Sequence, residues 1–470
     1  MNNDLSKFLI NKKYITAASE LAAELSYEIY IVGGFVRDMI IGRNKKEIDF
    51  LVVGNGLVFA EKFAERLKVK NVSMFKNFGT AHFKYHGYDF EFVGARRESY
   101  NRGSRKPIVE NGTFLDDIKR RDFTINTLAL SLNKKNFGEL IDVYGGQIDI
   151  EKKIIKTPLN PYVTFDDDPL RIMRAFRFAA QLDFKIEHSL LEAAEKMAPR
   201  LKIVSQERIT DELFKILASP TPSIGLIYAF HTKVFKEIFP ELHAMGGVEQ
   251  RMEYHHKDVF FHTCMVVDNI AKNTENIWLR FAALVHDIAK PQTKKFVEGT
   301  GWTFHGHDEI GARVMKHIFR RMKLPLSKLE YIQKLVRLHL RPIALVDEEV
   351  TDSAIRRLIV SAGEDLEDLI TLCRADITSK DPSKVKRYLT NYEIVMKKVF
   401  EVKEKDQLRA FQSPVDGNTI MKICNIGPSI LVGKIKDAIE EAILEGKIKN
   451  EYDDAYQYLL AIKDQFLAGN

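Results

Sequence analysis

The chain has few cysteines, no long apolar run and no strong excess of charge. Its three cysteines, Cys264, Cys373 and Cys424, are far apart, and none belongs to a CxxC pair. An odd number of isolated cysteines argues against a disulfide framework and a cysteine zinc site, so we expect reduced, structural thiols. The apolar runs are too short to span a bilayer, and the amino-terminal stretch shows no apolar segment followed by a cleavage site. We therefore expect a cytoplasmic protein without a membrane span.

What is present is a long globular chain with a slight basic excess. The 470 residues are 45% hydrophobic and 29% charged, and this length predicts two to four domains. The net charge of +6 results from 71 basic and 65 acidic residues, and by itself it says little about a partner. The arrangement of particular residues is more informative than the composition.

Hydrophobic periodicity divides the chain into an α/β part and a helical part. Short apolar runs predict strands in EIYIVGG and IDFLVVG, and two-residue alternation predicts a hairpin in GTAHFKYHGYDFEFVGARR, whereas GLVFAEKFAERLK has helical periodicity. From about Asp166 onward helical periodicity is sustained, and no convincing strand pair is expected. The predicted fold class is α+β, with a small mixed sheet followed by an all-α remainder. Interruptions of the periodicity give the predicted domains 1–155, 156–240, 241–380 and 381–470.

A glycine turn joins the first predicted strand to a helix. The strand ends in Gly33 and Gly34 and is followed directly by FVRD. Such a turn exposes backbone N–H groups at the positive end of a helix, where an anion such as a triphosphate can approach closely. Arg37 would add a charge-assisted contact to phosphate oxygens, and Asp38 could orient Arg37 or the turn. Taken alone, an ordinary helix start with a solvated arginine explains this turn equally well.

Two carboxylates follow in the next predicted strand. Glu47 and Asp49 are residues i and i+2, so their side chains point to the same face and need a cation between them. Mg²⁺ suits oxygen ligands and substrate phosphates, and Glu91 on a later strand could supply a third carboxylate for an attacking hydroxyl. This arrangement predicts an in-line nucleotidyl transfer with pyrophosphate as leaving group. The alternative is an ordinary polar strand face.

The motif RRDFTINTLAL places four polar residues at a predicted helix start. Arg120 and Arg121 are candidates for phosphate contact. Asp122 and Asn126 would share one helix face and could hold one sugar. The alternative is a helix start with a hydrogen-bonded aspartate.

The stretch DDPLRIMR combines an acid and a base three residues apart. Asp168 and Arg171 present an acceptor and several donors, which match the Watson–Crick edge of a base. Cytosine and adenine both offer an amino donor beside a ring acceptor. Arg174, one turn further, could reach the phosphates. The alternative is a surface ion pair between Asp168 and Arg171.

Histidines and aspartates are grouped on several predicted helices of the second half. An adjacent His-Asp pair with further His and Asp residues can assemble a mixed nitrogen and oxygen site for a transition metal or Mg²⁺. The candidate ligands are His262, His286, Asp287, His307, His339 and Asp376. A lone buried histidine is usually structural, and we keep that interpretation for His305 and His317.

The order of the motifs resembles a known enzyme family. VGGFVRD, EID, RRDFTINTLAL, ELIDVYGGQIDI, DDPLRIMRAFRFAAQL and SQERITDELFKIL follow one another as in bacterial-type CCA-adding tRNA nucleotidyltransferases. That family belongs to the polymerase-beta-like nucleotidyltransferase superfamily and includes the bacterial poly(A) polymerases. The resemblance implies a nucleotidyltransferase head, a helical neck that selects nucleotides and binds RNA, and template-independent addition of CCA to tRNA from CTP and ATP.

The resemblance also implies roles for individual residues. Asp122 would bond the ribose hydroxyls, and the Asp168–Arg171 pair would select CTP and then ATP. The polar segment at residues 95–122, which has the composition of a mobile loop, would contain the element that helps the switch from C to A addition. One departure is Glu47, where the family usually has aspartate, and it leaves a loss of activity or a changed metal preference open.

The histidine pattern resembles the HD phosphohydrolase superfamily. The resemblance implies one metal with the ligands His262, His286, Asp287 and Asp376. It places His307 and His339 near a second metal or the substrate phosphate. Bound metal would activate water for hydrolysis of a phosphomonoester or a cyclic phosphodiester.

Basic helix faces suit contact with the backbone of a folded RNA such as tRNA, although a solvated helix face is the usual explanation for single lysines. They contain Arg313, Lys316, Arg320, Arg321, Lys384, Lys386, Arg387, Lys434, Lys436, Lys447 and Lys449. Poly(A) polymerases and enzymes that add only CC or only A share the same head and stay as alternatives. Two further alternatives are an HD phosphohydrolase with a degenerate head and a non-enzymatic RNA-binding scaffold. The oligomeric state is not predicted.

Overall fold

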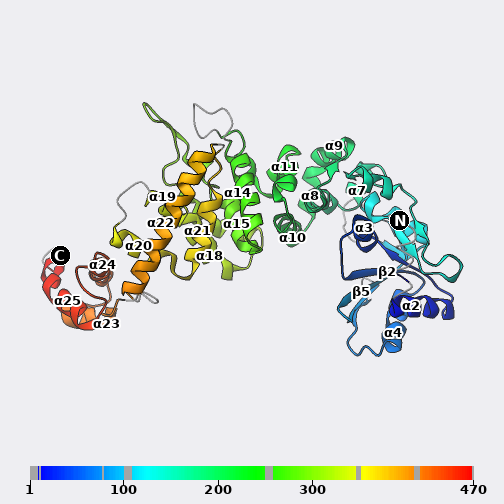
Figure 1. Ribbon diagram of the computed structural model, residues 1–470, viewed down its shortest axis with the longest axis horizontal. Helices are drawn as coiled ribbons and strands as arrows, with labels where there is room; N and C mark the ends of the chain where they lie inside the picture. The colour runs from blue at the N-terminus through cyan, green and yellow to red at the C-terminus, as the bar shows by residue number, and fades with distance from the viewer. Residues whose placement is uncertain are drawn as a thin grey trace. The chain divides into compact units, whose positions relative to one another are not determined.

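A computed structural model describes Leu9 and residues 12–76, 79–99, 108–248, 258–345, 351–379, 381–406 and 413–467. The chain divides into two compact units between Ala244 and Met245, close to the predicted boundary at residue 240. The first unit contains the sheet and the helices that follow it, and the second is mostly helical (Figure 1). The finer division into four domains stays a prediction.

Within the described residues, the first unit is built on a seven-stranded mixed sheet of order β3-β4-β5-β2-β1-β8-β9. β2 and β5 are parallel, and the other neighbouring strands are antiparallel. The strands are β1 (Glu28–Val32), β2 (Glu47–Val53), β3 (Ser73–Phe75), β4 (Thr80–Tyr85), β5 (Tyr88–Gly94), β8 (Ala129–Ser131) and β9 (Leu140–Ile141). The two strands predicted from apolar runs and the hairpin predicted from two-residue alternation are confirmed.

One face of this sheet carries an aromatic core. Phe50, Phe83 and Phe92 are fully buried on three neighbouring strands. The rings of Phe50 and Phe92 are stacked with centroids 4.9 Å apart, and Phe63 meets Phe92 edge-on. The helices that cover this face are α2 (Lys13–Glu24) and α4 (Gly56–Arg66) (Figure 1). Burial of these large rings accounts for the stability of the β2–β5 pair.

The opposite face of the sheet is covered over one half only. There Tyr30, Val32 and Leu51 pack against Ile118 of the short helix α5 (Phe114–Lys119). The other half carries the polar residues of β2 and β5, and the Glu47 side chain retains 70% of its exposure. This polar half of the sheet is the floor of the candidate active site.

The polar segment at residues 95–122 is more ordered than its composition predicts. Strands β6 (Arg96–Ser99) and β7 (Ile108–Asn111) form an antiparallel pair, and α5 follows. A capping box between Thr113 and Asp116 begins α5. The expectation of a continuous loop is therefore wrong for these residues, and residues 100–107 lie outside the described residues.

Two short strand pairs correct the expectation that the chain has none after Asp166. β11 (Lys185–Ile186) pairs in parallel with β10 (Ile154–Ile155). β12 (Lys295–Val297) forms a hairpin with β13 (Gly301–Thr303). Strands of two or three residues are too short for alternation to be recognised in a sequence.

The remainder of the first unit is helical, as predicted. Its helices are α3 (Gly34–Ile41), α6 (Gly146–Glu151), α7 (Pro161–Asp167), α8 (Leu170–Leu182), α9 (His188–Met197), α10 (Gln206–Leu217), α11 (Pro222–His231), α12 (Val234–Ile238) and α13 (Pro240–Ala244). α8 packs on α10 and α11. Arg177 of α8 forms a buried ion pair with Glu212 of α10, Nε to Oε2 3.1 Å, which fixes the helix that carries Arg171 and Arg174.

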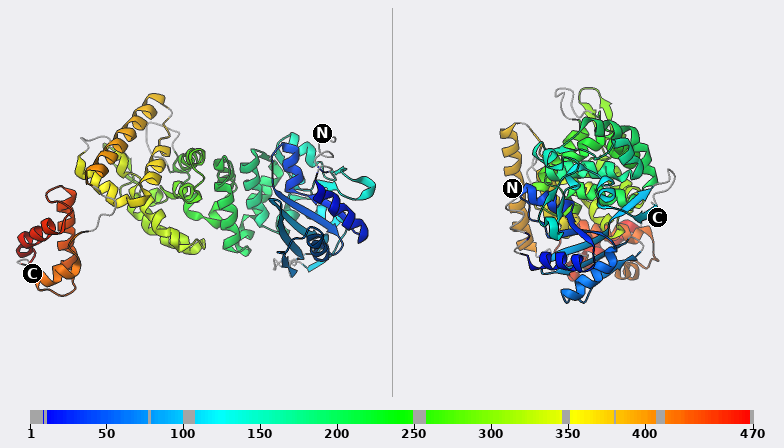
Figure 2. Two further views of the ribbon diagram at one scale, coloured as in Figure 1. Left: turned by 60° about the horizontal axis from the view of Figure 1, so that its bottom comes forward. Right: turned by 90° about the vertical axis from the view of Figure 1, so that its right-hand side faces the viewer.

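The second unit consists mainly of helices. They are α14 (Val259–Asn273), α15 (Ile277–Val285), α16 (Lys290–Thr293), α17 (His307–Arg321), α18 (Leu329–Leu338), α19 (Arg341–Ala344), α20 (Asp352–Ala362), α21 (Leu366–Ala375), α22 (Pro382–Asp406), α23 (Gly417–Cys424), α24 (Ile430–Leu444) and α25 (Tyr452–Leu467). α23, α24 and α25 pack together around Ile420, Ile435, Ile439 and Leu459 (Figure 2). In the part of the chain that the structure describes, no helix combines the length and apolar character needed to cross a membrane.

Candidate active site and metal centre

The glycine turn lies beside one of the predicted carboxylates. Gly33 follows β1 with φ +74°, a conformation that favours glycine, and α3 begins at Gly34. The last residue of β1 pairs with Asp49 of β2. A Cβ added to Gly33 would lie 3.0 Å from Arg121 Nη1 and 3.7 Å from Asp49 Oδ2. The structure thus brings Gly33, Asp49 and Arg121 together, although they are far apart in the sequence.

The three predicted carboxylates share the polar half of the sheet. Asp49 is the direct partner of Glu91 in the parallel β2–β5 pair, and Glu47 is two residues earlier on the same face. Burial raises the pKa of Asp49 to about 6, and the charges of Glu91 and Glu47 act in the same direction, whereas Arg121 and Lys45 oppose them. The raised pKa means that the two basic neighbours do not fully compensate the negative charge of Asp49. Oxygen donors on one face are the ligands that Mg²⁺ prefers. The residues present therefore fit a divalent cation at this position.

Glu47 is the least constrained of the three. Its side chain is 70% exposed, and Oε2 lies 3.6 Å from Lys45 Nζ. The longer side chain in place of the family's usual aspartate is therefore free to turn toward Asp49 or away from it. Whether Glu47 ligates a cation stays a prediction.

Arg37 is buried and bonded to two neighbouring side chains. It retains 4% of its exposure, and its guanidinium donates to both carboxylate oxygens of Asp38 at 2.9 and 3.0 Å. Arg37 Nη1 also donates to Asn126 Oδ1 at 2.6 Å. Asp38 therefore orients Arg37, one of the two roles considered for it. These bonds use three of the five guanidinium N–H groups, and contact between Arg37 and a phosphate stays a prediction.

Asp122 and Asn126 are brought together, but not on an α-helix. Phe123 between them has an extended backbone, and residues Thr124–Asn126 form a single 3-10 turn, so the predicted shared helix face is wrong. Asn126 Nδ2 nevertheless donates to Asp122 Oδ1 at 2.9 Å, and Arg174 donates to Asp122 Oδ2 at 2.6 and 2.8 Å. Burial raises the pKa of Asp122, but Arg174 and Asn126 outweigh it and hold the pKa at about 2. Asp122 is therefore ionised and tied to the neck helix α8, and its contact with a ribose stays a prediction.

Asp168 and Arg171 do not form the surface ion pair that was the alternative. Asp168 Oδ2 accepts from Arg208 Nη2 of α10 at 3.0 Å. Arg171 is buried, and its Nη2 donates to the carbonyl of Arg120 at 2.6 Å. Arg208 thus contacts a predicted base-reading side chain. The reading of a base by Asp168 and Arg171 stays a prediction.

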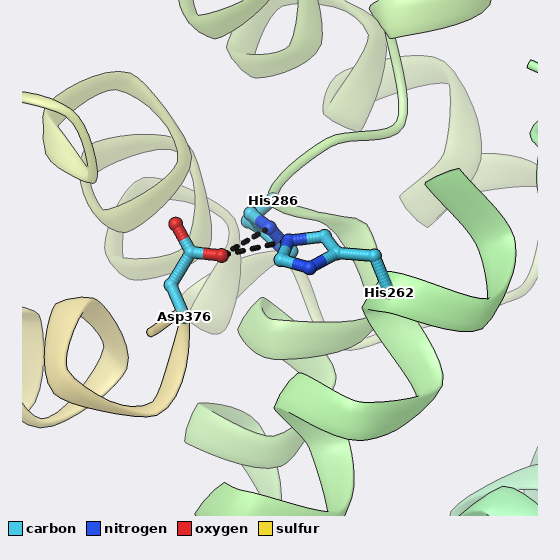
Figure 3. Close-up of side chains that lie close together, drawn as sticks. All are labelled: His262, His286 and Asp376. Carbon is cyan, nitrogen blue, oxygen red and sulfur yellow. Dashed lines mark ion pairs between the residues drawn. The ribbon is translucent and has the colours of Figure 1, made fainter. Parts of the chain in front are cut away.

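The metal centre of the second unit lies among helices α14, α15, α17, α18 and α21. Figure 3 shows His262, His286 and Asp376 facing one another, with Asp376 Oδ1 2.8 Å from His262 Nε2 and 3.5 Å from His286 Nε2. A second group of ligand atoms belongs to Asp287, His307 and His339. All six predicted ligands are therefore brought together.

Asp287 lies between the two groups. Its Oδ2 is 3.2 Å from His286 Nε2 and 3.7 Å from His262 Nε2. Its Oδ1 is 3.3 Å from His307 Nε2 and 3.7 Å from His339 Nε2. The resemblance implied Asp287 as a ligand of the first metal alone, whereas this geometry lets one carboxylate serve two neighbouring positions.

The ring orientations of the histidines are fixed by hydrogen bonds on the far nitrogen. Nδ1 lies 2.8 Å from the Ala283 carbonyl in His286, and carbonyl contacts of 2.7 and 2.6 Å hold His307 and His339. His262 Nδ1 lies 2.8 Å from Thr378 Oγ1. A carbonyl only accepts, so Nδ1 of the first three rings carries the proton and Nε2 faces the centre.

Several ligand atoms of the centre are buried without a well-formed hydrogen bond among the described residues. His286 Nε2, Asp287 Oδ1 and Asp376 Oδ1 are buried, and within the described residues they have no hydrogen bond of normal geometry. Burial lowers the pKa of His286, but Asp287 and Asp376 outweigh it and raise the pKa to about 10. A proton is thus attracted to the place where a cation would bind. This mixed nitrogen and oxygen donor set fits a transition metal or Mg²⁺.

Two residues near these sites were missed at the sequence level. Lys290 Nζ lies 2.7 Å from Asp287 Oδ2, three residues along the chain, in the motif LVHDIAK. Asp117 is fully buried and binds both Arg120 and Arg121. The i to i+3 and i to i+4 spacing of opposite charges is a recognisable signal in both places.

Comparison with known protein families divides the chain in a similar way. Residues 29–156 match the family described as "Poly A polymerase head domain". Residues 183–245 match "Probable RNA and SrmB- binding site of polymerase A", and residues 254–380 match "HD domain". The matches contain the glycine turn, the carboxylates of β2 and β5, and the histidine centre.

Curated relatives carry two related names. The A-adding tRNA nucleotidyltransferase of Deinococcus radiodurans is 31% identical, over 71% of this chain and 76% of the relative. The multifunctional CCA protein of Nitrosococcus oceani is 31% identical, over 66% of this chain and 74% of the relative. The A-adding tRNA nucleotidyltransferase of Aquifex aeolicus is 38% identical, but the match spans 48% of this chain and only 30% of that longer protein.

Solved structures of tRNA-processing enzymes have the same fold. A CCA-adding enzyme in an apo form aligns with a TM-score of 0.66 at 22% identity, over 98% of both chains. A tRNA nucleotidyltransferase complexed with a primer tRNA and an incoming ATP analog aligns with a TM-score of 0.59 at 24% identity, over 81% of this chain and 98% of the other. From its matched head and HD domains and from relatives that it covers over about three quarters of their length, this chain belongs to the tRNA nucleotidyltransferase family of enzymes.

Proposed function

We propose that this protein completes the 3′ end of tRNA by adding C, C and A from CTP and ATP, with release of pyrophosphate. The observation that carries the proposal is the convergence of Gly33, Asp49 and Arg121 at the end of β1. The names of the relatives, A-adding tRNA nucleotidyltransferase and multifunctional CCA protein, support the same class of reaction.

The residues of the head divide the reaction between them. The backbone N–H groups after Gly33 and the Arg121 guanidinium bind the triphosphate. Asp49, Glu47 and Glu91 would hold two divalent cations, which would supply charge neutralisation for the triphosphate and the attacking oxygen. Glu91, beside Asp49 on the sheet, accepts the proton of the tRNA 3′-hydroxyl as that oxygen attacks the α-phosphorus. Pyrophosphate leaves in line with the attacking oxygen.

The neck supplies nucleotide selection. Asp122, kept ionised by Arg174 and Asn126, accepts from the ribose hydroxyls. Asp168 accepts from the amino group of cytosine or adenine, and Arg171 donates to the adjacent ring nitrogen. Uracil and guanine have a carbonyl where the amino group is required, so an ionised Asp168 repels them. Selection thus comes from protein side chains without a template.

Addition of A alone is the second candidate. The Aquifex and Deinococcus relatives, at 38% and 31% identity, are both named A-adding enzymes. The same head, carboxylates and base-reading pair serve this reaction, because CTP and ATP share the amino donor and ring acceptor.

The test uses tRNA transcripts that end before the first C, after CC, or after CCA, with labelled CTP or ATP and Mg²⁺. Three added nucleotides followed by a stop support CCA addition, and incorporation only into the CC transcript selects the A-adding reaction. Unlimited A addition selects a poly(A) polymerase. Asp49→Ala should abolish incorporation, whereas Glu61→Ala, an exposed acidic residue of α4, should leave it unchanged. A fully active Asp49→Ala protein would overturn the proposed site.

We also propose that helix faces of the second unit bind tRNA. Arg313, Lys316 and Arg320 lie on one exposed face of α17. Lys384 and Lys386 are exposed at the start of α22. Charge reversal at Arg313 and Arg320 should weaken tRNA binding and reduce its salt dependence without changing the KM for ATP. An unchanged salt slope would contradict the assignment.

A metal-dependent hydrolase in the second unit is supported by the buried, unpartnered ligand atoms of its centre. A bound cation there would activate water for attack on a phosphomonoester or cyclic phosphodiester. Asp287→Ala should remove phosphate release from model esters and leave nucleotide incorporation unchanged, and Asp49→Ala should do the reverse. Hydrolysis that survives Asp287→Ala would place it elsewhere.

A further inference from the structure

Asp117 is a buried carboxylate beside the nucleotide site that the proposed reaction does not use. It is the fourth residue of α5 and has no exposed surface. Arg120 Nε donates to Asp117 Oδ1 at 3.0 Å, and Arg120 Nη2 contacts the same oxygen. Arg121 Nη2 donates to Asp117 Oδ2 at 3.1 Å. Each carboxylate oxygen therefore holds a different arginine.

Arg121 reaches the end of the site that carries the carboxylates of β2 and β5. Arg121 Nη1 is the atom nearest to a Cβ added at Gly33, and Arg121 lowers the pKa of Asp49 by its charge. Arg121 Nε is buried and has no hydrogen bond within the described residues. The bond from Nη2 to Asp117 thus fixes one end of a guanidinium whose Nη1 lies at the glycine turn.

Arg120 connects Asp117 to the part of the site that is predicted to read the base. The carbonyl of Arg120 accepts from Arg171 Nη2 at 2.6 Å, so the position of the Arg120 backbone sets the position of the buried Arg171 guanidinium. Arg120 is the C-cap residue that follows α5, and its side chain is bound by Asp117, three residues earlier. One carboxylate is therefore linked to both ends of the nucleotide site.

We infer that Asp117 is a positioning residue for nucleotidyl transfer, which holds Arg121 toward the triphosphate and, through Arg120, aligns Arg171 with the base. This inference rests on the proposed function. An exposed i to i+4 ion pair would contribute little, but a fully buried carboxylate with charge-assisted bonds to two arginines fixes their geometry. α5 begins directly after β7, so Asp117 also connects the β6–β7 hairpin to the site.

The test compares Asp117→Asn with Asp116→Asn on the same helix. Asp116 is partly exposed and completes the capping box of α5 with Thr113, so its substitution controls for loss of helix stability. Asp117→Asn should raise the KM for CTP and ATP by about tenfold or more, as expected for loss of charge-assisted hydrogen bonds, and should increase misincorporation of UMP. Asp116→Asn should lower the melting temperature without either effect.

A double variant separates positioning from general stability. If Asp117 acts through Arg121, adding Asp117→Asn to Arg121→Gln should raise the KM far less than it does in the wild-type background. Full additivity, or equal KM values for Asp117→Asn and Asp116→Asn, would overturn the inference. Should Asp117→Asn fail to fold, Asp117→Glu, which keeps the charge but moves it by one methylene, is assayed in the same way. A wild-type protein that incorporates no nucleotide would instead refute the proposed function.

Discussion

Replacing Asp49 by asparagine should stabilise the protein while abolishing its activity. Burial and the negative charges of Glu91 and Glu47 raise the pKa of Asp49 from 3.8 to about 6. Above pH 6 the folded protein must hold this carboxylate in its charged form without a cation. Asparagine has nearly the same shape and no charge, so Asp49→Asn removes the free-energy cost of a buried negative charge beside two carboxylates.

The magnitude follows from the difference between the two pKa values. In the unfolded chain Asp49 loses its proton near pH 4, whereas in the folded protein it does so near pH 6. The folded protein binds more protons between these values, so its stability falls as the pH rises through this window. At about 1.4 kcal/mol per pKa unit, the loss above pH 6 is at most about 3 kcal/mol. For a unit of this size that corresponds to roughly 6–12 °C in melting temperature.

The assay is thermal unfolding with a chelator present, at a pH near 7.5 and at a pH near 4. Asp49→Asn should melt higher than the wild type at the higher pH, and the two should converge at the lower pH. Excess Mg²⁺ should raise the melting temperature of the wild type by more than that of the variant, because a bound cation stabilises the folded state by mass action and the variant has lost one of its two candidate cation sites. A variant that is less stable than the wild type at the higher pH would refute the reasoning.

Three further predictions concern neighbouring features. Gly33→Ala should lower incorporation, because an alanine at φ +74° costs about 1–3 kcal/mol and its Cβ would crowd Arg121, whereas Gly42→Ala, with open space around it, should leave kinetics unchanged. Asp38→Asn should destabilise the protein by about 3–5 kcal/mol in denaturant unfolding, because it leaves the buried Arg37 without its counter-charge, and a loss under about 1 kcal/mol would contradict this. His286→Ala should remove bound metal, measured by mass spectrometry of the purified protein, and nucleotide incorporation that fell in parallel would contradict two independent centres.

Local patterns predicted the centre of the sheet well. The alternation in β2, β4 and β5 reflects one buried and one polar face, and that pattern is readable without knowledge of the partner strands. The i and i+2 spacing placed Glu47 and Asp49 on one face for the same reason. The pairing of Asp49 with Glu91 in parallel strands depends on contacts between distant segments, so the sequence indicated a third carboxylate but not its register.

Long-range contacts explain what the sequence did not predict. Arg37 is bound by Asn126, 89 residues away, and a partner at that separation leaves no local signal. Asp168 is bound by Arg208 of another helix for the same reason. The 3-10 turn at Thr124–Asn126 arises where Phe123 is buried in an extended conformation, so tertiary packing overrides the helical periodicity of RRDFTINTLAL.

Three histidines of the metal centre, His286, His307 and His339, each bond the carbonyl of the residue three positions earlier in the chain. The residues that form the surrounding turn also set the orientation of each ring, so this orientation is kept as long as the turn is formed. Binding of a metal ion then requires only the loss of a proton and of water, without rearrangement of the backbone. The centre should accordingly fill and empty with different divalent ions at rates set by ion exchange rather than by refolding.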